Sequence, residues 1–555
     1  MNGEQVGGGV DPWAYVTSRR RATAWPKDVG DEALAVRPGR VGAAPEQKMA
    51  PLKAGVVYRF VMGVDPKPVK MPRAQLDLLD DPMGQLLQQG TFPLVVADLL
   101  AEVDTSGLLP DQASYLIGEA GQIRPQDAPQ LHRDFRFVVI RSRAGQADLL
   151  VSTSANDPTG FLQVAAWASR AGIFNYYMRL DKTWVWAGDS NSALAPGSRG
   201  MGCFDSHVNG SVVMKELRQP WMNWDSVNAT IQLADGDPLR KDPLYRKLSN
   251  AENLERTVRA GVSRWTASRL ARTISPDGVV SNVDWLLRQL CTSTTVNLAS
   301  STTESRVAAA TASGTMAPPV GFWLNFELLL DGLGIPADFE PPAAPAALYA
   351  KGLTRYGFAL VEDDFRQPGD TFFAFVVPEA AFEDVEVVQQ LVARGVITDK
   401  FAASVLMVDF ANPVFSPARA QLLRHVPTTA TLDPARGGLS GQVADAIVAA
   451  AKGRPASAPD AQFAANWRLK DTEWQSVFAA RIEAYMKAVT RRIATAKGFD
   501  DYLRLAESRR RELRQMFMRL NEFSLTLPVT NIAADAPLLA MRADGTVRAK
   551  AASQP

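Results

Sequence analysis

Two strand–turn–strand patterns between residues 134 and 190 constrain the fold of this chain more than any other feature. The first, DFRFVVIRSRAGQADLLVSTS, places β-like residues on both sides of Ala144-Gly145. The second, GIFNYYMRLDKTWVWAGDS, does the same around Asp181-Lys182. Runs of this kind on both sides of a short turn are typical of β-hairpins. The chain therefore contains at least two antiparallel strand pairs within its first third.

Helical periodicity marks much of the rest of the chain. The stretch PMGQLLQQGTFPLVVADLLAEVD (82–104) has helical spacing that is broken at Pro93. Residues 250–273 repeat apolar side chains at helical intervals after Asn250, a residue type that favours helix N-caps. Most of the last 200 residues have the same character. The sequence thus predicts an α+β protein, with β-hairpins in a mixed N-terminal part and mainly helical middle and C-terminal parts.

At 555 residues the chain is long enough for about two to four structural units. Its first residues are rich in Gly, Pro, Ala and Arg without apolar periodicity, which predicts an extended arm. We expect the following segments: an arm (1–55), a mixed α/β domain (56–195), a helical region (196–335), a helical C-terminal domain (336–530) and a tail (531–555).

The composition disfavours several classes of function. Lys and Arg total 60 against 59 Asp and Glu, so the net charge of +1 gives no global attraction to nucleic acid, and we expect no such partner. We find no run of about 18 apolar residues, so we expect no membrane span. With three histidines in the whole chain, hydrolytic histidine chemistry or a multi-histidine metal site has little room.

The stretch MGCFDSHVNG (201–210) pairs one of two cysteines with one of three histidines. Cys203 and His207 have the spacing of the first and last residues of a Cys-x-x-Cys-His haem attachment site, and Ser206 stands where the second thiol belongs. On one helical turn these positions share a face, so a thiol can reach a haem vinyl group while the imidazole coordinates iron. The alternative is a small buried thiol beside a structural histidine.

The run GCFDSHVNGSVVMKELRQPWMNWDS resembles a group of bacterial, largely uncharacterised c-type-cytochrome-like proteins. In these proteins Cys-x-x-Cys-His is followed by an Asn/Gly pair, MKEL and PW-x-x-W. The similarity extends in scattered blocks over most of residues 170–530, including ERTVRAGVSRWTASRL, ASVLMVDFANPVFSP and LNEFSLTLPVTNI. It implies a cytochrome-c-like region at 196–335, with Cys203 binding the cofactor and His207 as the proximal ligand of the haem iron. Because Ser206 departs from the motif, the expected cofactor is haem c with a single thioether or a non-covalent haem.

Two hypotheses for the function follow. The first is a haem-binding redox protein that acts in electron transfer or as a haem-dependent oxidoreductase, with an unspecified redox partner protein or small-molecule substrate. The second is a haem-free binding or scaffolding protein that retains the cytochrome-like fold. Neither the residues nor the resemblance identifies a catalytic residue, so whether the protein is an enzyme stays open.

The sequence does not identify a sixth iron ligand. Met214 would lie on the same side of a continuing helix as His207, which does not suit a distal ligand. His132 and His425 remain as candidates, although each is typical of a solvated or core histidine. Three tryptophans near the motif either wall a haem pocket or belong to the core: Trp221, Trp224 and Trp265.

The compartment depends on whether the chain is complete. Its start, MNGEQVGGGVDPWAYVTSRRR, lacks the apolar region of a secretory signal. Cys203 and Cys291 allow at most one disulfide, which fits either a reducing or an oxidising compartment. We expect a cytoplasmic protein if the chain is complete, and a periplasmic or exported one if this is a mature form with attached haem.

One charged run bears on how the C-terminal helices pack. ESRRRELRQ (507–515) interleaves Glu507 and Glu512 with arginines at helical spacing. Such interleaving is usual on a solvated helix face. We therefore expect this run to face water.

Overall fold

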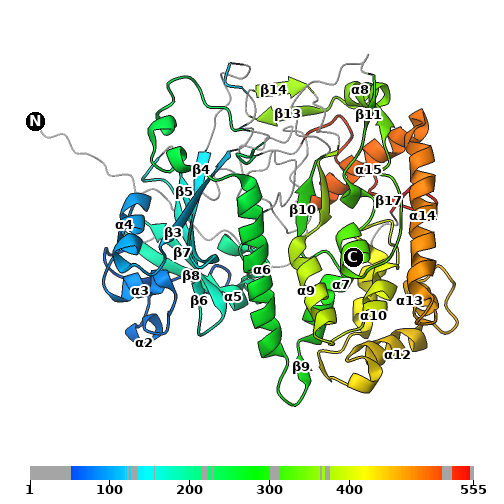
Figure 1. Cartoon of the computed structure of the whole chain (residues 1–555), viewed down its shortest axis with the longest axis horizontal. Coiled ribbons are helices and arrows are strands. Elements are labelled where there is room, and N and C mark those ends of the chain that lie inside the picture. Colours follow the sequence, from blue (N-terminus) through cyan, green and yellow to red (C-terminus); the bar gives the residue numbers. More distant parts are fainter. Residues whose placement is uncertain are drawn as a thin grey trace, which may run out of the picture.

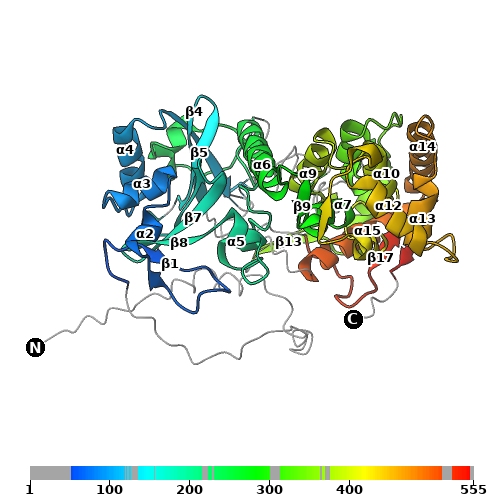
Figure 2. The same ribbon diagram turned by 90° about the horizontal axis from the view of Figure 1, so that it is seen from below.

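Two lobes lie side by side in the computed structural model (Figures 1 and 2), and the N-terminal lobe contains the large sheet while the C-terminal lobe is mainly helical. The structure describes residues 52–118, 121, 124–126, 135–155, 157–214, 223–227, 230–300, 313–362, 365–368, 375–515 and 528–550. The α+β class predicted from the sequence is confirmed, with hairpins concentrated in the N-terminal part. The predicted arm lies almost entirely outside the described residues.

An eight-stranded sheet forms the centre of the N-terminal lobe, in the order β2-β1-β8-β7-β6-β5-β4-β3. All neighbours are antiparallel except β1, which runs parallel to β8. Its strands are β1 (Tyr58–Arg59), β2 (Val69–Lys70), β3 (Asp111–Gly118), β4 (Phe135–Arg143), β5 (Gln146–Ser154), β6 (Leu162–Ala168), β7 (Ile173–Leu180) and β8 (Thr183–Asp189).

Both predicted hairpins are confirmed. The β4–β5 turn consists of Ala144 and Gly145, whose φ angles of 50° and 79° are left-handed. Left-handed φ at both central residues is the geometry of the two-residue turn that matches strand twist. In the β7–β8 turn Asp181 also has a positive φ, of 50°. Local turn chemistry therefore sets the register of this part of the sheet.

Helices cover both faces of the sheet (Figure 2). On one side lie α2 (Arg73–Leu76), α3 (Pro82–Gln88) and α4 (Val96–Ser106), so the predicted break near Pro93 is confirmed. On the other side α6 (Ala251–Thr273) begins after Asn250, whose side chain accepts from the Asn253 N–H at 3.3 Å as the predicted N-cap. Short elements complete the lobe: α5 (Ser190–Leu194), η3 (Gly202–Asp205), η4 (Pro238–Lys241) and η5 (Tyr245–Lys247).

Helix α6 connects the two lobes. Its Arg264 guanidinium pairs with Asp148 of β5 at 2.5 Å. On the C-terminal side, Gln390 Nε2 donates to the Ser263 carbonyl at 3.0 Å. Helix α6 therefore packs against both lobes and lies at the boundary between them.

The C-terminal lobe contains helices and two-stranded ribbons. Its helices are α7 (Val283–Cys291), α8 (Ala346–Arg355), α9 (Phe382–Ala393), α10 (Asp399–Leu406), α11 (Pro417–Ala420), α12 (Ser440–Ala450), α13 (Pro459–Trp467), α14 (Trp474–Ile493) and α15 (Ala496–Gln515). Its ribbons pair β9 (Val279–Ser281) with β16 (Thr429–Thr431), β10 (Val296–Ala299) with β15 (Val377–Ala380), β11 (Thr315–Met316) with β12 (Ala344–Pro345), β13 (Ala359–Glu362) with β14 (Phe365–Pro368), and β17 (Leu539–Met541) with β18 (Val547–Ala549). Three 3₁₀ helices are η6 (Val320–Phe322), η9 (Gln421–His425) and η10 (Pro434–Arg436), and η7 (Glu327–Gly332) is a π-helix.

The buried apolar residues form two large clusters that divide within α6. The first cluster runs from Val57 to Trp265, and the second runs from Leu270 to Met541. Cys203 belongs to the first cluster and Cys291 to the second. A hydrophobic cluster does not by itself define a domain, so the boundaries expected at residues 195 and 335 stay predictions.

Helix α15 corrects one expectation. The run from Glu507 to Glu512 does not face water, because Arg509 is 2% exposed and Arg510 is 0% exposed. The Arg510 guanidinium pairs with Glu507 at 2.7 Å and donates to the Val376 carbonyl at 2.8 Å. The prediction of a solvated face is wrong because backbone carbonyls from distant segments, rather than water, accept hydrogen bonds from these arginines.

None of the helices in the described ranges combines the length and the apolar character that a membrane crossing requires.

Candidate functional site

The residues of the haem-like motif lie on a single turn. Gly202 to Asp205 form the 3₁₀ helix η3, and the His207 N–H reaches the Cys203 carbonyl at 3.4 Å. Cys203 is 7% exposed and Ser206 is 1% exposed, whereas His207 is only partly buried. Cys203 therefore lies in η3, whereas Ser206 and His207 follow directly after the end of this helix.

A bulge in the sheet places an aromatic ring beside this turn. The register of β7 and β8 shifts between Tyr176 and Tyr177, and a bulge redirects the side chains next to it. The Tyr176 ring lies 5.0 Å from the His207 ring and 5.5 Å from the Phe204 ring, measured between centroids. Gly188, opposite Tyr176, has no room for a side chain, because a Cβ there would lie 2.8 Å from the Phe204 ring.

The His207 imidazole has a defined tautomer. Its Nδ1 lies 2.7 Å from the Ser211 carbonyl oxygen. A carbonyl oxygen only accepts, so Nδ1 carries a proton and the Nε2 of the neutral ring keeps its lone pair. A backbone carbonyl on Nδ1 is the usual partner of a metal-ligating histidine. The contact with Ser211 thus fixes the orientation of the His207 ring, with Nδ1 as its donor.

Of the two positions that carry thiols in Cys-x-x-Cys-His, only one is a cysteine in this chain. Both cysteines are buried thiols that are not joined in a disulfide. Cys203 supplies one sulfur on the His207 turn, and the Ser206 hydroxyl cannot form the second thioether. Within the described residues, no group of three or more His, Cys, Asp and Glu side chains is arranged to hold a metal ion. An axial haem ligand needs no such group, so His207 is the residue to which the cofactor prediction applies.

The chain after His207 does not continue as a helix. Gly210 has a left-handed φ of 77°, and a Cβ there would lie 2.5 Å from the Ser190 carbonyl oxygen. The Ser190 hydroxyl donates to the Gly210 carbonyl at 2.6 Å and fixes this turn. The expectation of a continuing helix, which placed Met214 on the same side as His207, is therefore wrong. Met214 is buried in the core of the N-terminal lobe.

The other candidate residues from the sequence lie in different parts of the structure. Trp265 Nε1 donates to the Asn209 carbonyl at 2.8 Å, so this tryptophan packs on the motif loop. Trp224 is 2% exposed in the N-terminal core. His425 lies in the C-terminal lobe, where its Nε2 is 2.9 Å from Asp460 Oδ1. His132 and Trp221 lie outside the described residues.

A buried polar chain joins the motif loop to the C-terminal lobe, and the sequence analysis missed it. Asn209 Nδ2 donates to Thr294 Oγ1 at 2.9 Å, and this hydroxyl donates to Asp384 Oδ1. The Thr294 N–H donates to Asp384 Oδ2 at 2.9 Å. These residues are 85 and 90 positions apart, so no local pattern could have indicated the contact. We call Asn209, Thr294 and Asp384 the seam chain.

Burial shifts the pKa values of charged groups in and beside the seam chain. Burial raises the pKa of Asp384 to about 7, against the lowering effects of the Thr294 hydrogen bonds and of Arg199, and Glu383 raises it further. Burial lowers the pKa of Arg269 to about 10, the nearby Arg199 lowers it further, and Asp384 opposes the change. The seam therefore holds a carboxyl group that can gain or lose a proton near neutral pH, beside two guanidinium groups.

Two cavities are distinct from the motif. One of about 340 Å³ lies between α15 and the C-terminal ribbon, and a smaller one of about 30 Å³ lies between α3 and α4. Neither Cys203 nor His207 lines either cavity. These cavities are thus separate sites from the one that the motif predicts.

Comparison with known proteins gives no relative. No family model, no curated protein and no solved structure matches the chain. The resemblance to c-type-cytochrome-like proteins therefore stays a prediction from the motif.

Proposed function

We propose that this protein is a haem-binding redox protein, with His207 as the axial iron ligand and Cys203 as the only possible covalent attachment. The observation that carries the proposal is the hydrogen bond from His207 Nδ1 to the Ser211 carbonyl at 2.7 Å. A bound haem would supply a one-electron iron couple, for electron transfer or for a haem-dependent oxidation. Covalent attachment would go with a periplasmic or exported location.

The chain's own residues have definite parts in this proposal. The Ser211 carbonyl orients the imidazole and makes its Nε2 a better donor to a metal. The Tyr176 ring restricts the rotation of His207 from one side. Arg199, four residues before Cys203, contributes positive charge at the seam, which suits the carboxylates that a haem carries.

A second candidate is a haem-free binding or scaffolding protein. It is favoured by the burial of Cys203 and Ser206, and by the contacts of the motif loop with both lobes. Through Asn209 the loop accepts from Trp265 and donates to Thr294. On this reading the motif loop is a structural connection, and His207 is held by Ser211 only to stabilise the turn.

The visible spectrum of the purified protein separates the two candidates. The full chain should be produced in cells that mature c-type cytochromes, together with His207→Ala and, as a matched control, His425→Ala. Haem binding at His207 predicts a Soret band in the parent and the control that is lost or strongly shifted in His207→Ala. A colourless parent, or a band that is unchanged in His207→Ala, favours the haem-free candidate.

A further inference from the structure

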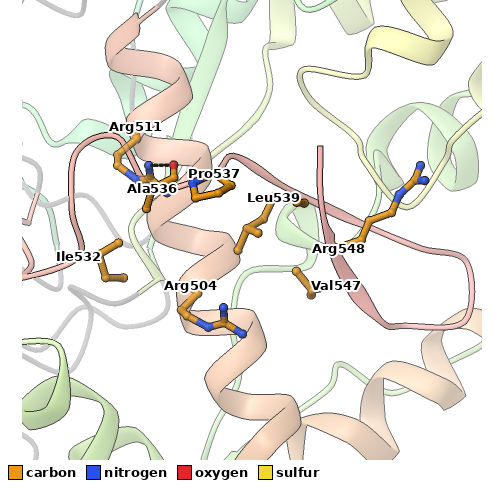
Figure 3. A pocket seen from close by; sticks show the side chains of 9 residues that line it. Arg504, Arg511, Ile532, Ala536, Pro537, Leu539, Val547 and Arg548 are labelled. Atoms are coloured by element: carbon orange, nitrogen blue, oxygen red, sulfur yellow. Dashed lines mark hydrogen bonds between the residues drawn. The ribbon is translucent and has the colours of Figure 1, made fainter. Parts of the chain in front are cut away.

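The larger cavity, of about 340 Å³, lies between α15 and the ribbon β17–β18 (Figure 3). A water molecule occupies about 30 Å³ of liquid, so the space corresponds to roughly ten small atoms. Small-molecule sites start at about 300 Å³ and combine apolar walls with a few polar groups. The cavity is thus large enough for a small ligand.

One side of the cavity is apolar. The ribbon contributes Leu539 and Val547, and the segment before it contributes Ile532 and Pro537. In Figure 3 Pro537, Leu539 and Val547 lie on one side of α15. Such walls favour an aliphatic body over a fully polar ligand.

The helix side of the cavity is positively charged. Arg504 lines it and contacts Asp500 at 3.2 Å and Asp501 at 2.6 Å. Asp500 also pairs with Arg355, and Asp501 also pairs with Arg492 and Lys497. Arg504 therefore shares both of its carboxylate partners with other cations.

A second arginine in the wall is buried and incompletely bonded. Arg511 is 5% exposed, and its Nη1 donates to the carbonyls of Ala534 and Ala536, the second of which Figure 3 shows. Its Nε finds no acceptor within the described part of the chain. Two carboxylates, Glu507 and Asp535, interact with the charge of Arg511, and Glu507 is already paired with Arg510. Arg548 also lines the cavity, but its guanidinium extends away from the other side chains in Figure 3.

From the cavity, its apolar wall, the arginines Arg504 and Arg511 that line it and the Arg511 Nε that has no acceptor among the described residues, we propose that this site binds a small amphiphilic monoanion, with a carboxylate head and a short aliphatic body. The head lies against the arginines of α15, and the body lies against Leu539 and Val547. Arginine is well suited to bind a carboxylate through two parallel hydrogen bonds. This site is independent of the haem proposal, because none of its lining residues belongs to the motif loop.

Calorimetric titration of the full chain with octanoate tests the proposal. Octanol, which has the same body without charge, and acetate, which has the charge without the body, are the comparison ligands. We expect octanoate to bind saturably and at least about tenfold more tightly than either of them, a difference of about 1.4 kcal/mol. Absence of saturable octanoate binding, or equal binding of octanoate and octanol, overturns the proposal.

Three variants locate the binding. Arg504→Gln, at a half-exposed position, should weaken octanoate about tenfold and leave octanol unchanged. Val547→Phe should fill the cavity and remove octanoate binding while the circular dichroism spectrum stays that of the parent. Arg491→Ala, an exposed arginine on α14, is the control and should bind octanoate as the parent does. Parent-like octanoate binding by a folded Val547→Phe protein would place the site elsewhere and contradict the proposal.

Discussion

The Thr294 N–H donates to the Asp384 carboxylate at 2.9 Å, and the Thr294 hydroxyl joins the same carboxylate to Asn209 of the motif loop. The two lobes therefore meet through a buried titratable group, which Thr294 connects to Asn209, two residues after His207. The seam chain makes the stability of this contact depend on pH.

The pH dependence has a definite sign. The pKa of Asp384 is raised from its ordinary value of 3.8 to about 7, so the folded protein holds this proton more tightly than the unfolded chain. The stabilising contribution is complete below about pH 4 and is lost as the pH rises through about 7. At about 1.4 kcal/mol per pKa unit the loss is on the order of 4 kcal/mol.

Asp384→Asn should flatten this part of the stability profile between pH 4 and pH 7. The free energy of unfolding in urea, measured at several pH values, checks the prediction. Asp471→Asn, whose side chain is 88% exposed, is the control and should follow the parent. Parallel profiles for the parent and Asp384→Asn would show that Asp384 titrates normally.

Gly210→Ala should destabilise the turn that follows His207. The substitution forces an unfavourable φ and a clash with the Ser190 carbonyl, and we expect a loss on the order of 3 kcal/mol. Gly145→Ala has a similar φ of 79° but meets no atom within 4 Å, so it should cost only about 1 kcal/mol. Equal thermal stabilities of the two variants would mean that the chain around Ser190 and Gly210 is not closely packed.

Arg510→Met should be strongly destabilising, although the sequence pattern of residues 507–515 predicts a solvent-exposed helix face. It removes the 2.7 Å partner of the buried Glu507 carboxylate, which keeps Arg514 at 3.4 Å, and we expect a cost of about 3 kcal/mol. Arg491→Met, at an exposed position of α14, should cost well under 1 kcal/mol. Urea denaturation compares the two, and similar midpoints would contradict the burial of α15.

These predictions show which parts of the structure the sequence could reveal. The hairpins at Ala144-Gly145 and Asp181-Lys182 and the N-cap at Asn250 depend on neighbouring residues, so local patterns predicted them correctly. The burial of Arg510 depends on the Val376 carbonyl, 134 positions away, and no local pattern carries that information. The interleaved charges at Glu507 predicted a solvent-exposed face, because contacts with acceptors far away in the sequence do not affect the spacing of residues along the helix.

Part of the candidate site could also be predicted from local sequence patterns, and part could not. The spacing of Cys203, Ser206 and His207 indicated one helical turn, and the structure has them on η3 and the residues directly after it. The contact of His207 with Ser211 lies within the same short loop but depends on the turn at Gly210, which the assumption of a continuing helix excluded. The seam chain depends on tertiary contacts between lobes and was therefore invisible.

Ser206→Cys should restore the second thioether if the haem proposal holds. The new thiol lies on the same turn as Cys203, so the reduced pyridine haemochrome of the variant should shift to that of a doubly attached haem. Ser106→Cys, which adds a thiol at an exposed position of α4, should leave the spectrum as in the parent. A Ser206→Cys protein that folds but contains no more than singly attached haem would speak against a haem beside this turn.

The central claim, that the chain binds haem through His207, is tested most directly by the haem content of the purified protein. The full chain, produced in cells that mature c-type cytochromes, is assayed as pyridine haemochrome before and after acid–acetone extraction. Our account predicts about one haem per chain, resistant to extraction if Cys203 forms its thioether and extractable if it does not. A folded protein with no haem in either fraction would contradict it.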